Sequence, residues 1–405
     1  MQKSRLGYAL AVLAASSSLV SFRAALAAET PDVIVERKDK KTKGTVIKEG
    51  PKEVTYKDEK DKEKTIAWEN IVRIDYKDFP SELAAAEAAV DRRAYDKAEK
   101  AADDAIRAVS DGRFKDLFLT RACVAKARAL RCLSSFKEAA EVAKRGIEAA
   151  NGNRWEVHAH VERVAALAGM GSDEVGSACS DGAKACDAYS NEVAKDFRAE
   201  IALAAGNYYL DKGETSKAKE QYGTAENSTK FADRAKLGRA RVKIKEKDLK
   251  GAEEMFQNIA RSSTDADALA GASLGLGDTS LEKAKRSNPL NGDELRDALE
   301  LYLRGAVLAQ PTGGGASDNH EKTLRGAAQV CELIAGTISV PQDKKAKDWE
   351  KQASQRKFFV DYARKLYEDC VKTYPASKGS DDDKKKISDL KAKAIALSAT
   401  PEGQK

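Results

Sequence analysis

The segment Gly206–Ile259 reads GNYYLDKGETSKAKEQYGTAENSTKFADRAKLGRARVKIKEKDLKGAEEMFQNI, and it contains one pattern twice. The pattern is a triad of apolar or aromatic residues that recurs 34 positions later: Ala218, Tyr222 and Ala225, then Ala252, Phe256 and Ile259. Spacings of four and three residues place each triad on one face of an α-helix. Gly213 precedes the first copy and suits the end of an earlier helix. The segment therefore predicts successive helical hairpins.

A period of 34 residues is that of the tetratricopeptide repeat. Gly206–Gly213 agrees with it, because a small residue is followed by an aromatic one helical turn later and then by a closing glycine. This stretch resembles the tetratricopeptide family. The resemblance implies a mainly α protein, built as a right-handed α-solenoid whose first helices line a concave, ligand-holding face. Stacked hairpins of this kind offer an extended binding surface.

Further copies of the pattern are expected along the chain. Offsets of three, four and three residues recur in three segments, and a last copy precedes Pro375: Tyr95, Ala98, Ala102, Ala105; Phe136, Ala139, Ala143, Gly146; Leu295, Ala298, Tyr302, Gly305; Ala363, Tyr367, Cys370. The intervals between copies are unequal, which predicts insertions and a degenerate pair between Trp155 and Tyr189. We expect six to eight hairpins over residues 80–398 and a disordered tail at residues 399–405.

Three segments interrupt this helical pattern. We expect loops at residues 286–292 and at the glycine-rich residues 311–317, which are too short and irregular to cradle a phosphate. The charged run at residues 378–386 is expected to be a solvated connection to a last helix that ends near Ser398.

Residues 31–78 have a different character. Short runs of β-branched and aromatic residues alternate with charged and glycine clusters, which predicts five strands: Val33–Val35, Gly44–Ile47, Val54–Tyr56, Thr65–Trp68 and Ile71–Ile74. Many tight turns between short strands favour a small closed barrel over an open sheet with exposed edges. The order is similar to the small Sm-like or Src-homology-type barrels of some exported bacterial proteins. Pro80 ends this segment, and Ser81 is expected to cap the first helix.

Residues 1–27 have the pattern of a secretory signal peptide. Lys3 and Arg5 precede a short apolar run, and Ala25–Ala27 offers small residues for cleavage. The run is shorter than the roughly 18 residues that span a bilayer, so we expect cleavage and no membrane span in the mature chain. The expected location is the periplasm or envelope of a bacterium. Cleavage removes Lys3, Arg5 and Arg23, so the net charge falls from +6 to +3, which argues against a nucleic-acid partner.

The composition and motifs favour no enzyme class. The chain is 42% hydrophobic and 34% charged, which suits a soluble helical protein. His158 and His160 are two positions apart, so on a helix they point in different directions and cannot share a metal, and we expect both to be partly exposed. His320 is expected to cap a helix. No nucleophile elbow, zinc signature or catalytic lysine motif is present. We expect no catalytic residues, no metal and no cofactor.

Six cysteines are present, without any Cys-x-x-Cys pair: Cys123, Cys132, Cys179, Cys186, Cys331 and Cys370. Neighbouring cysteines on one helix are too far apart to form a disulfide, so any bridge must join different helices. The alternative is that each cysteine is a small apolar residue of the core.

A basic stripe lies on the helix expected before the second triad: Arg239, Arg241, Lys243 and Lys245. By the 34-residue register, Arg241 is equivalent to Asn207, and Lys245 is equivalent to Asp211. The resemblance places these four on the concave face, so Asn207, Asp211, Arg241 and Lys245 are the candidate partner-binding residues. The alternative is a solubilising surface. Leu203 occupies the position where carboxylate-binding members of the family have a lysine. We therefore do not infer carboxylate binding for this chain from the resemblance.

Two functions remain open. In the first, the protein is a non-enzymatic scaffold that binds a peptide or partner protein through the concave solenoid face. In the second, it is an envelope structural or assembly factor in which the N-terminal barrel recognises the partner and the solenoid is a spacer.

Overall fold

The structure is a computed structural model, and it describes residues 31–109, 114–309, 318–375 and 379–398. The expected signal peptide at residues 1–27, the glycine-rich loop at 311–317 and the tail at 399–405 lie outside the described residues. The described residues form two compact units: residues 31–81 with Gly152–Arg154, and the described parts of residues 82–151 and 155–398. Among the described helices, none has an apolar stretch long enough to cross a membrane.

The first unit contains one antiparallel sheet of five strands in the order β4-β3-β2-β1-β5. The strands are β1 (Asp32–Glu36), β2 (Lys41–Glu49), β3 (Glu53–Lys57), β4 (Glu63–Ala67) and β5 (Ile71–Asp75). Each strand overlaps one of the five predicted runs, so the strand prediction is confirmed. Two short 3-10 turns, Arg37–Asp39 and Trp68–Asn70, precede β2 and β5.

The predicted closed barrel is wrong. Among the described residues, β4 pairs only with β3 and β5 pairs only with β1, so the sheet has two open edges. The first half of β2 pairs with β1 and its second half pairs with β3, with a register shift between Val46 and Lys48. The β4 edge exposes Glu63 and Lys64, and such charges protect an open edge from further pairing. An open sheet is therefore tolerated.

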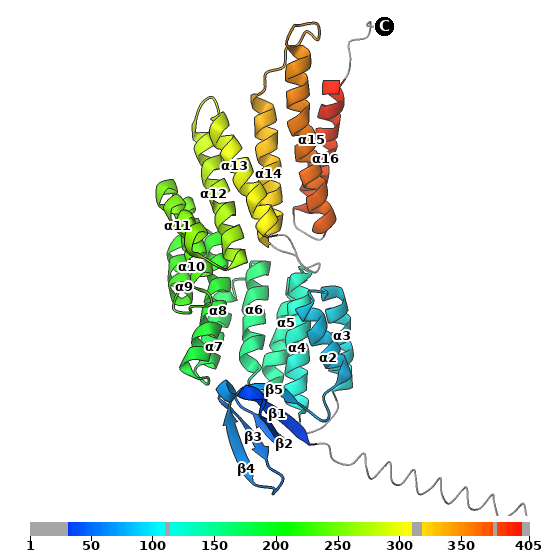
Figure 1. Cartoon of the computed structure of the whole chain (residues 1–405), viewed down its shortest axis with the longest axis vertical. Coiled ribbons are helices and arrows are strands. Elements are labelled where there is room, and N and C mark those ends of the chain that lie inside the picture. The colour runs from blue at the N-terminus through cyan, green and yellow to red at the C-terminus, as the bar shows by residue number, and fades with distance from the viewer. Residues whose placement is uncertain (1–30, 110–113, 310–317, 376–378, 399–405) are drawn as a thin grey trace, which may run out of the picture. The chain divides into compact units, whose positions relative to one another are not determined.

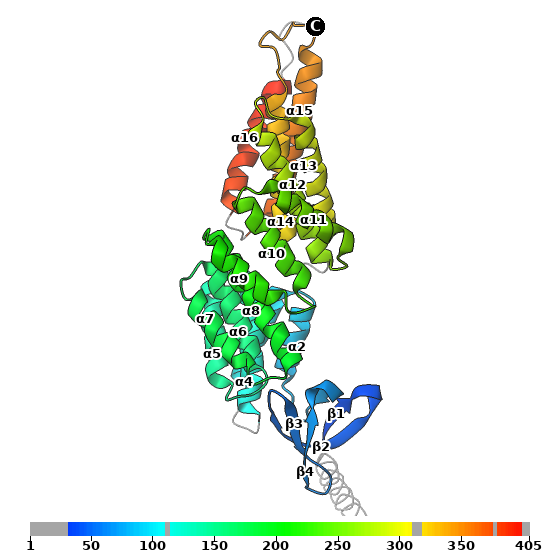
Figure 2. The same cartoon turned by 90° about the vertical axis from the view of Figure 1, so that its left-hand side faces the viewer.

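The second unit is helical, with fifteen α-helices in its described part (Figure 1 and Figure 2). These are α2 (Ser81–Asp91), α3 (Tyr95–Ala108), α4 (Lys115–Cys132), α5 (Phe136–Ala149), α6 (Glu156–Met170), α7 (Val175–Cys186), α8 (Asn191–Asp211), α9 (Thr215–Ala225), α10 (Ala232–Lys245), α11 (Leu249–Ser262), α12 (Ala266–Arg286), α13 (Gly292–Leu308), α14 (Asp318–Thr337), α15 (Trp349–Thr373) and α16 (Ser380–Ser398).

The helices from α4 to α14 pack as successive hairpins. Each even-numbered helix contacts the odd-numbered helix that follows it, and it also contacts the next even-numbered helix. The even-numbered helices are therefore the first helices of the hairpins, and they form a continuous row. The degenerate pair predicted between Trp155 and Tyr189 is present as α6 and α7.

The predicted triads form the core of these hairpins. Tyr222 and Phe256 are fully buried, and their alanine partners Ala218 and Ala252 are buried too. The Tyr222 ring reaches the first helices on both sides, because it leaves no room for a Cβ atom at a glycine of α8 or at a glycine of α10. Tyr222 thus joins its own hairpin to the next one by packing on the glycine backbone of both first helices.

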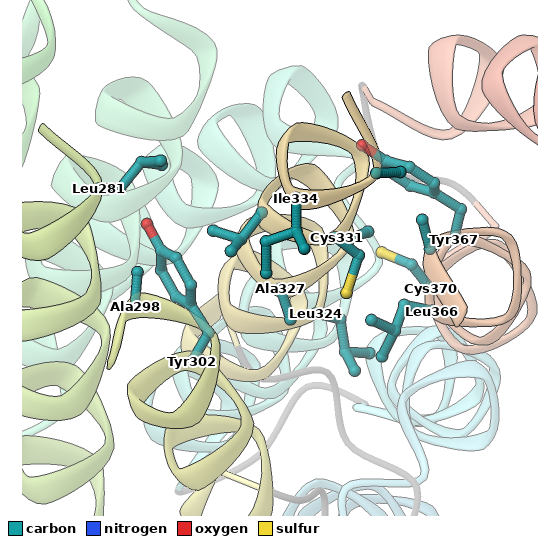
Figure 3. Packing of buried hydrophobic residues seen from close by; sticks show 14 of the residues in the cluster. Leu281, Ala298, Tyr302, Leu324, Ala327, Cys331, Ile334, Leu366, Tyr367 and Cys370 are labelled. Atoms are coloured by element: carbon teal, nitrogen blue, oxygen red, sulfur yellow. The ribbon is translucent and has the colours of Figure 1, made fainter. Parts of the chain in front are cut away.

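The C-terminal core lies between α12 and α16. Figure 3 shows Tyr302, Leu324 and Tyr367 in this core, with the sulfur atoms of Cys331 and Cys370 between α14 and α15. All six cysteines are free thiols, and four of them are buried. Burial raises the pKa of the Cys331 and Cys370 thiols to about 12.

The charged run at residues 378–386 is not a solvated connection. Helix α16 begins at Ser380, and Asp383 is only 4% exposed. Its carboxylate accepts a hydrogen bond from Nε of Arg325 at 2.8 Å. The prediction was wrong because an arginine from α14 neutralises this aspartate inside the packed end of the bundle.

Candidate functional site

Polar side chains from four first helices converge around Arg241 on α10. Its Nη2 donates a hydrogen bond to Oδ1 of Asn319 on α14, at 3.2 Å. Nδ2 of Asn319 in turn donates to the carbonyl oxygen of Asp267 on α12, at 3.2 Å. These two bonds join α10, α12 and α14 on the row of first helices. We call Asn207, Asp211, Tyr222, Arg241, Asp278, Asn319 and Lys322 the inner-face cluster.

The α8 side of the inner-face cluster is organised by a buried phenol. Oη of Tyr222 donates a hydrogen bond to Oδ1 of Asn207, at 2.8 Å. Burial raises the pKa of Tyr222, the charge of Arg241 opposes this shift, and the charge of Asp211 adds to it. Of the four predicted site residues, Asn207 therefore bonds to this phenol, and the charges of Arg241 and Asp211 act on its pKa. Lys245 is exposed at the end of α10 and has no hydrogen bond or ion pair in the described part of the chain.

The α12 side of the inner-face cluster is acidic. Oδ1 of Asp278 accepts a hydrogen bond from Oη of Tyr302, at 2.6 Å. Burial raises the pKa of Asp278, and the Tyr302 hydrogen bond, Arg241 and Lys322 oppose this shift. The resulting surface presents both charges, so it suits a partner that carries both donors and acceptors, such as a peptide main chain with mixed side chains.

Sequence reasoning missed Asp278, Asn319 and Lys322. The 34-residue register breaks after the second triad, so it does not connect α12 and α14 to the earlier hairpins. A usable signal lies in the tyrosines: Tyr302 bonds to Asp278, and Tyr367 donates to Glu332 at 2.8 Å. Each tyrosine is the central residue of its triad. Its hydroxyl bonds to an acidic side chain on the first helix of the same hairpin.

A second polar cluster joins α4, α6 and α8. Glu162 on α6 is 1% exposed, and its carboxylate accepts hydrogen bonds from Nε of Arg128 at 2.6 Å and from Nε of Arg131 at 2.8 Å. Burial alone would raise the pKa of Glu162, but the two guanidinium groups lower it overall. Glu200 on α8 lies near this group, and burial raises its pKa.

This cluster extends the repeat toward the N-terminus. Arg128 and Glu162 are 34 positions apart, and so are Arg121 on α4 and Glu87 on α2, whose side chains bond at 2.8 Å. Two ion pairs that link α2, α4 and α6 therefore each join residues 34 positions apart.

The basic stripe splits into two rows. Arg239 donates to Glu226, and Lys243 donates to Asp248, so this row is paired within the protein. The hydrogen bond to Asp248 raises the pKa of Lys243. Arg241 lies in the other row, and its guanidinium bonds to Asn319 of the inner-face cluster.

The histidines do not form a site. His158 packs between the rings of Trp155 and Phe197. His160 is buried rather than partly exposed, and burial lowers its pKa. Nδ1 of His320 bonds to Oη of Tyr374 at 2.8 Å, so its ring lies against the residue that follows α15. Among the described residues, no group of three or more potential ligands is placed to hold a metal ion.

Comparison with known proteins yields structural similarity only. No family model matches the chain, and no curated protein matches it. A tetratricopeptide repeat protein from Parabacteroides merdae is similar in structure, with 13% identity and a TM-score of 0.43 over 78% of this chain and 97% of that one. The Cut9–Hcn1 hetero-tetramer of the APC/C has 16% identity and a TM-score of 0.35 over 75% of this chain and 57% of that chain. The repeat architecture therefore rests on the spacings and contacts within this chain.

The raised pKa of Asp278 predicts a pH-dependent effect of Asp278→Asn. The native chain binds this proton at a higher pH than the unfolded chain does, so Asp278 lowers stability as the pH rises above the unfolded pKa of about 3.9. Asparagine removes this loss and keeps an oxygen acceptor for Tyr302. We expect thermal unfolding to show a stabilised variant at about pH 8, with the difference vanishing near pH 4. The control Glu300→Gln, at an exposed position, should show no such trend, and a variant that is no more stable at about pH 8 would contradict this account.

Proposed function

We propose that this chain is a non-enzymatic interaction scaffold, a right-handed tetratricopeptide-like solenoid that binds an extended segment of a partner protein along α8, α10 and α12. The observation that carries the proposal is the convergence of Asn207, Arg241 and Asp278 from three successive first helices. Asn207 is exposed, and its amide offers both a donor and an acceptor to a peptide main chain. Arg241 offers a planar donor group to an acidic side chain.

The row of first helices supports binding of an extended partner rather than a compact ligand. The polar groups of the inner-face cluster come from α8, α10, α12 and α14, which are successive helices of the row, and from α9. Solenoids of stacked hairpins bind in this way because each hairpin adds a further strip of surface. Recognition would then depend on several weak contacts, each with side chains of a different hairpin.

We also infer that the protein acts outside the cytoplasm of a bacterium, in the periplasm or envelope. The support is the charged, apolar and small-residue pattern of residues 1–27. The open β5 edge, with Val72 62% exposed, supports a second candidate function in which the sheet recognises the partner by strand addition.

Site-specific crosslinking tests these proposals in one experiment. A photoreactive residue is placed at Lys245, one helical turn from Arg241 on α10, at Lys250 on the second helix α11 as a control, or at Val72 on β5, in cells that make the protein. We expect a crosslinked polypeptide from position 245 only, in the envelope or periplasmic fraction, and a several-fold smaller yield after Arg241→Ala. The recovered protein should begin just after Ala27.

Other crosslinking results would contradict specific parts of these proposals. Equal yields from positions 245 and 250 would contradict inner-face binding. Crosslinks confined to position 72 would favour recognition by the sheet. Recovery of the crosslinked product from the cytoplasm, with residues 1–27 intact, would contradict export. Far-ultraviolet circular dichroism of the Arg241→Ala variant would establish that its fold is retained.

A further inference from the structure

A second surface, distinct from the inner-face cluster, lies between α13 and α15. Figure 1 shows α14 between these two helices, and both pack against it. Two adjoining cavities of about 560 and 480 Å³ follow this boundary and share Arg296, Ile334 and Phe359 in their walls. We call them together the α13–α15 groove. Its floor includes Ile334, which belongs to the C-terminal core (Figure 3).

The walls of the α13–α15 groove include large apolar side chains that are unusually exposed. Val307 is 74% exposed and Phe358 is 63% exposed, the two highest values among the large apolar side chains in the described part of the chain. Leu299, Leu303 and Val307 are spaced four residues apart along one face of α13. Contiguous apolar surface of this kind marks an interaction site, because its exposure to water is unfavourable.

The aromatic wall is held in place before any partner arrives. The ring of Phe358 lies edge-on to Phe359, with centroids 5.2 Å apart, and it stacks on Tyr362 at 6.1 Å. An exposed ring that is already fixed loses little conformational freedom on binding. Phe358 therefore suits the role of an anchor for an apolar side chain of a partner.

Positive charge borders the apolar strip. Arg296 and Arg304 both line the groove and are exposed, and eight residues separate them, which is about 12 Å along a helix. Arg296 pairs only with the exposed Asp293, and Arg304 has no ion pair or hydrogen bond within the described residues. Glu300 is the one acidic residue among those that line either cavity.

We propose that the α13–α15 groove docks an amphipathic helix of a partner protein, whose apolar face covers Phe358, Phe359 and Val307 and whose carboxylates pair with Arg296 and Arg304. A groove between two helices that pack on a third accepts a helix by the same packing that joins neighbouring hairpins. A second copy docked through the same surface would bring Arg296 and Arg304 near their own equivalents, so charge favours an acidic partner. This inference is independent of the inner-face proposal.

The test uses the full chain and two synthetic, fluorescently labelled helical peptides of about 14 residues. Both carry leucines at positions i, i+4, i+7 and i+11, and they differ in having glutamate or lysine beside the leucines. Fluorescence anisotropy should give a Kd on the order of 10 µM for the glutamate peptide and binding about tenfold weaker for the lysine peptide. Val307→Asp and Arg304→Glu should each weaken binding of the glutamate peptide by about tenfold.

Two control variants separate this groove from other surfaces. Ile395→Asp changes an apolar residue on α16 that is 62% exposed and lies outside the groove, and it should leave binding unchanged. Arg241→Ala should also leave binding unchanged. Loss of binding in Arg241→Ala alone would place the peptide on the inner face and overturn this inference, while leaving the proposed function intact.

Further outcomes would overturn the inference as well. Equal binding of the two peptides would contradict the proposed pairing of Arg296 and Arg304 with carboxylates of the partner. Wild-type binding by Val307→Asp, or no binding of either peptide, would remove the groove itself as a helix site. Sedimentation velocity identifies the remaining alternative: a dimer of the wild-type chain that Val307→Asp converts to a monomer would assign the groove to a second copy of this chain.

Discussion

Glu162→Ala should destabilise the helical unit by about 3–5 kcal/mol, because it leaves the guanidinium groups of Arg128 and Arg131 without their shared carboxylate. Glu162 is 1% exposed, so water cannot easily take its place. Urea denaturation followed by far-ultraviolet circular dichroism measures the loss. It should appear as a lower midpoint at a similar slope.

A triple variant provides the matched control for this ion group. Arg128→Met, Arg131→Met and Glu162→Leu together replace the two guanidinium groups and their shared carboxylate by apolar groups of similar size. Such a replacement of a buried ion pair is often neutral or stabilising. We expect it to recover most of the stability lost in Glu162→Ala. A single variant within about 1 kcal/mol of the wild type would mean that the ion group does not hold α4 to α6.

Gly275→Ala should destabilise the chain although alanine is the better helix former. An added Cβ atom on α12 would lie 2.2 Å from Cζ of the fully buried Phe256 ring. The ring cannot move away without disturbing α11, so we expect a loss of about 1–3 kcal/mol from overpacking. Thermal and urea unfolding would both report this loss.

Gly223→Ala is the control, because Gly223 also lies inside a helix but has nothing within 4 Å of an added Cβ atom. Here the helix propensity of alanine should stabilise by up to about 1 kcal/mol. The two substitutions are chemically identical and should have opposite signs. Phe256→Leu combined with Gly275→Ala should restore part of the loss. If Gly275→Ala also stabilised the protein, the contact between ring and glycine would not be holding neighbouring hairpins together.

The sequence predicts the helical hairpins well, because their cores repeat. A buried triad such as Ala218, Tyr222 and Ala225 needs only local spacing to be recognised, and its burial is confirmed. The five strands were likewise predictable from local composition. Closure of the sheet was not, because it depends on whether β4 and β5 meet, and no local pattern determines the pairing of two strands that are distant in sequence.

The candidate site was only partly predictable for a related reason. Asn207 and Arg241 follow from the 34-residue register, and the structure places both near the Tyr222 phenol. Asp278 and Asn319 belong to the same inner-face cluster. Insertions separate the later hairpins, so the 34-residue register does not align these two residues with Arg241. The charged start of α16 was misread because a buried aspartate with an arginine partner has the same local sequence as a solvated one.

Burial of the thiols of the C-terminal core affects how readily they react with oxidants. A thiolate is the form of cysteine that reacts with oxidants and disulfides. With pKa values of about 12, Cys331 and Cys370 hold almost no thiolate near neutral pH while the core is closed. Under oxidising conditions, these two cysteines would therefore form disulfides in molecules whose C-terminal core has unfolded, and not in folded molecules. The closed core therefore lowers the reactivity of both sulfur atoms, and opening of the core would restore it.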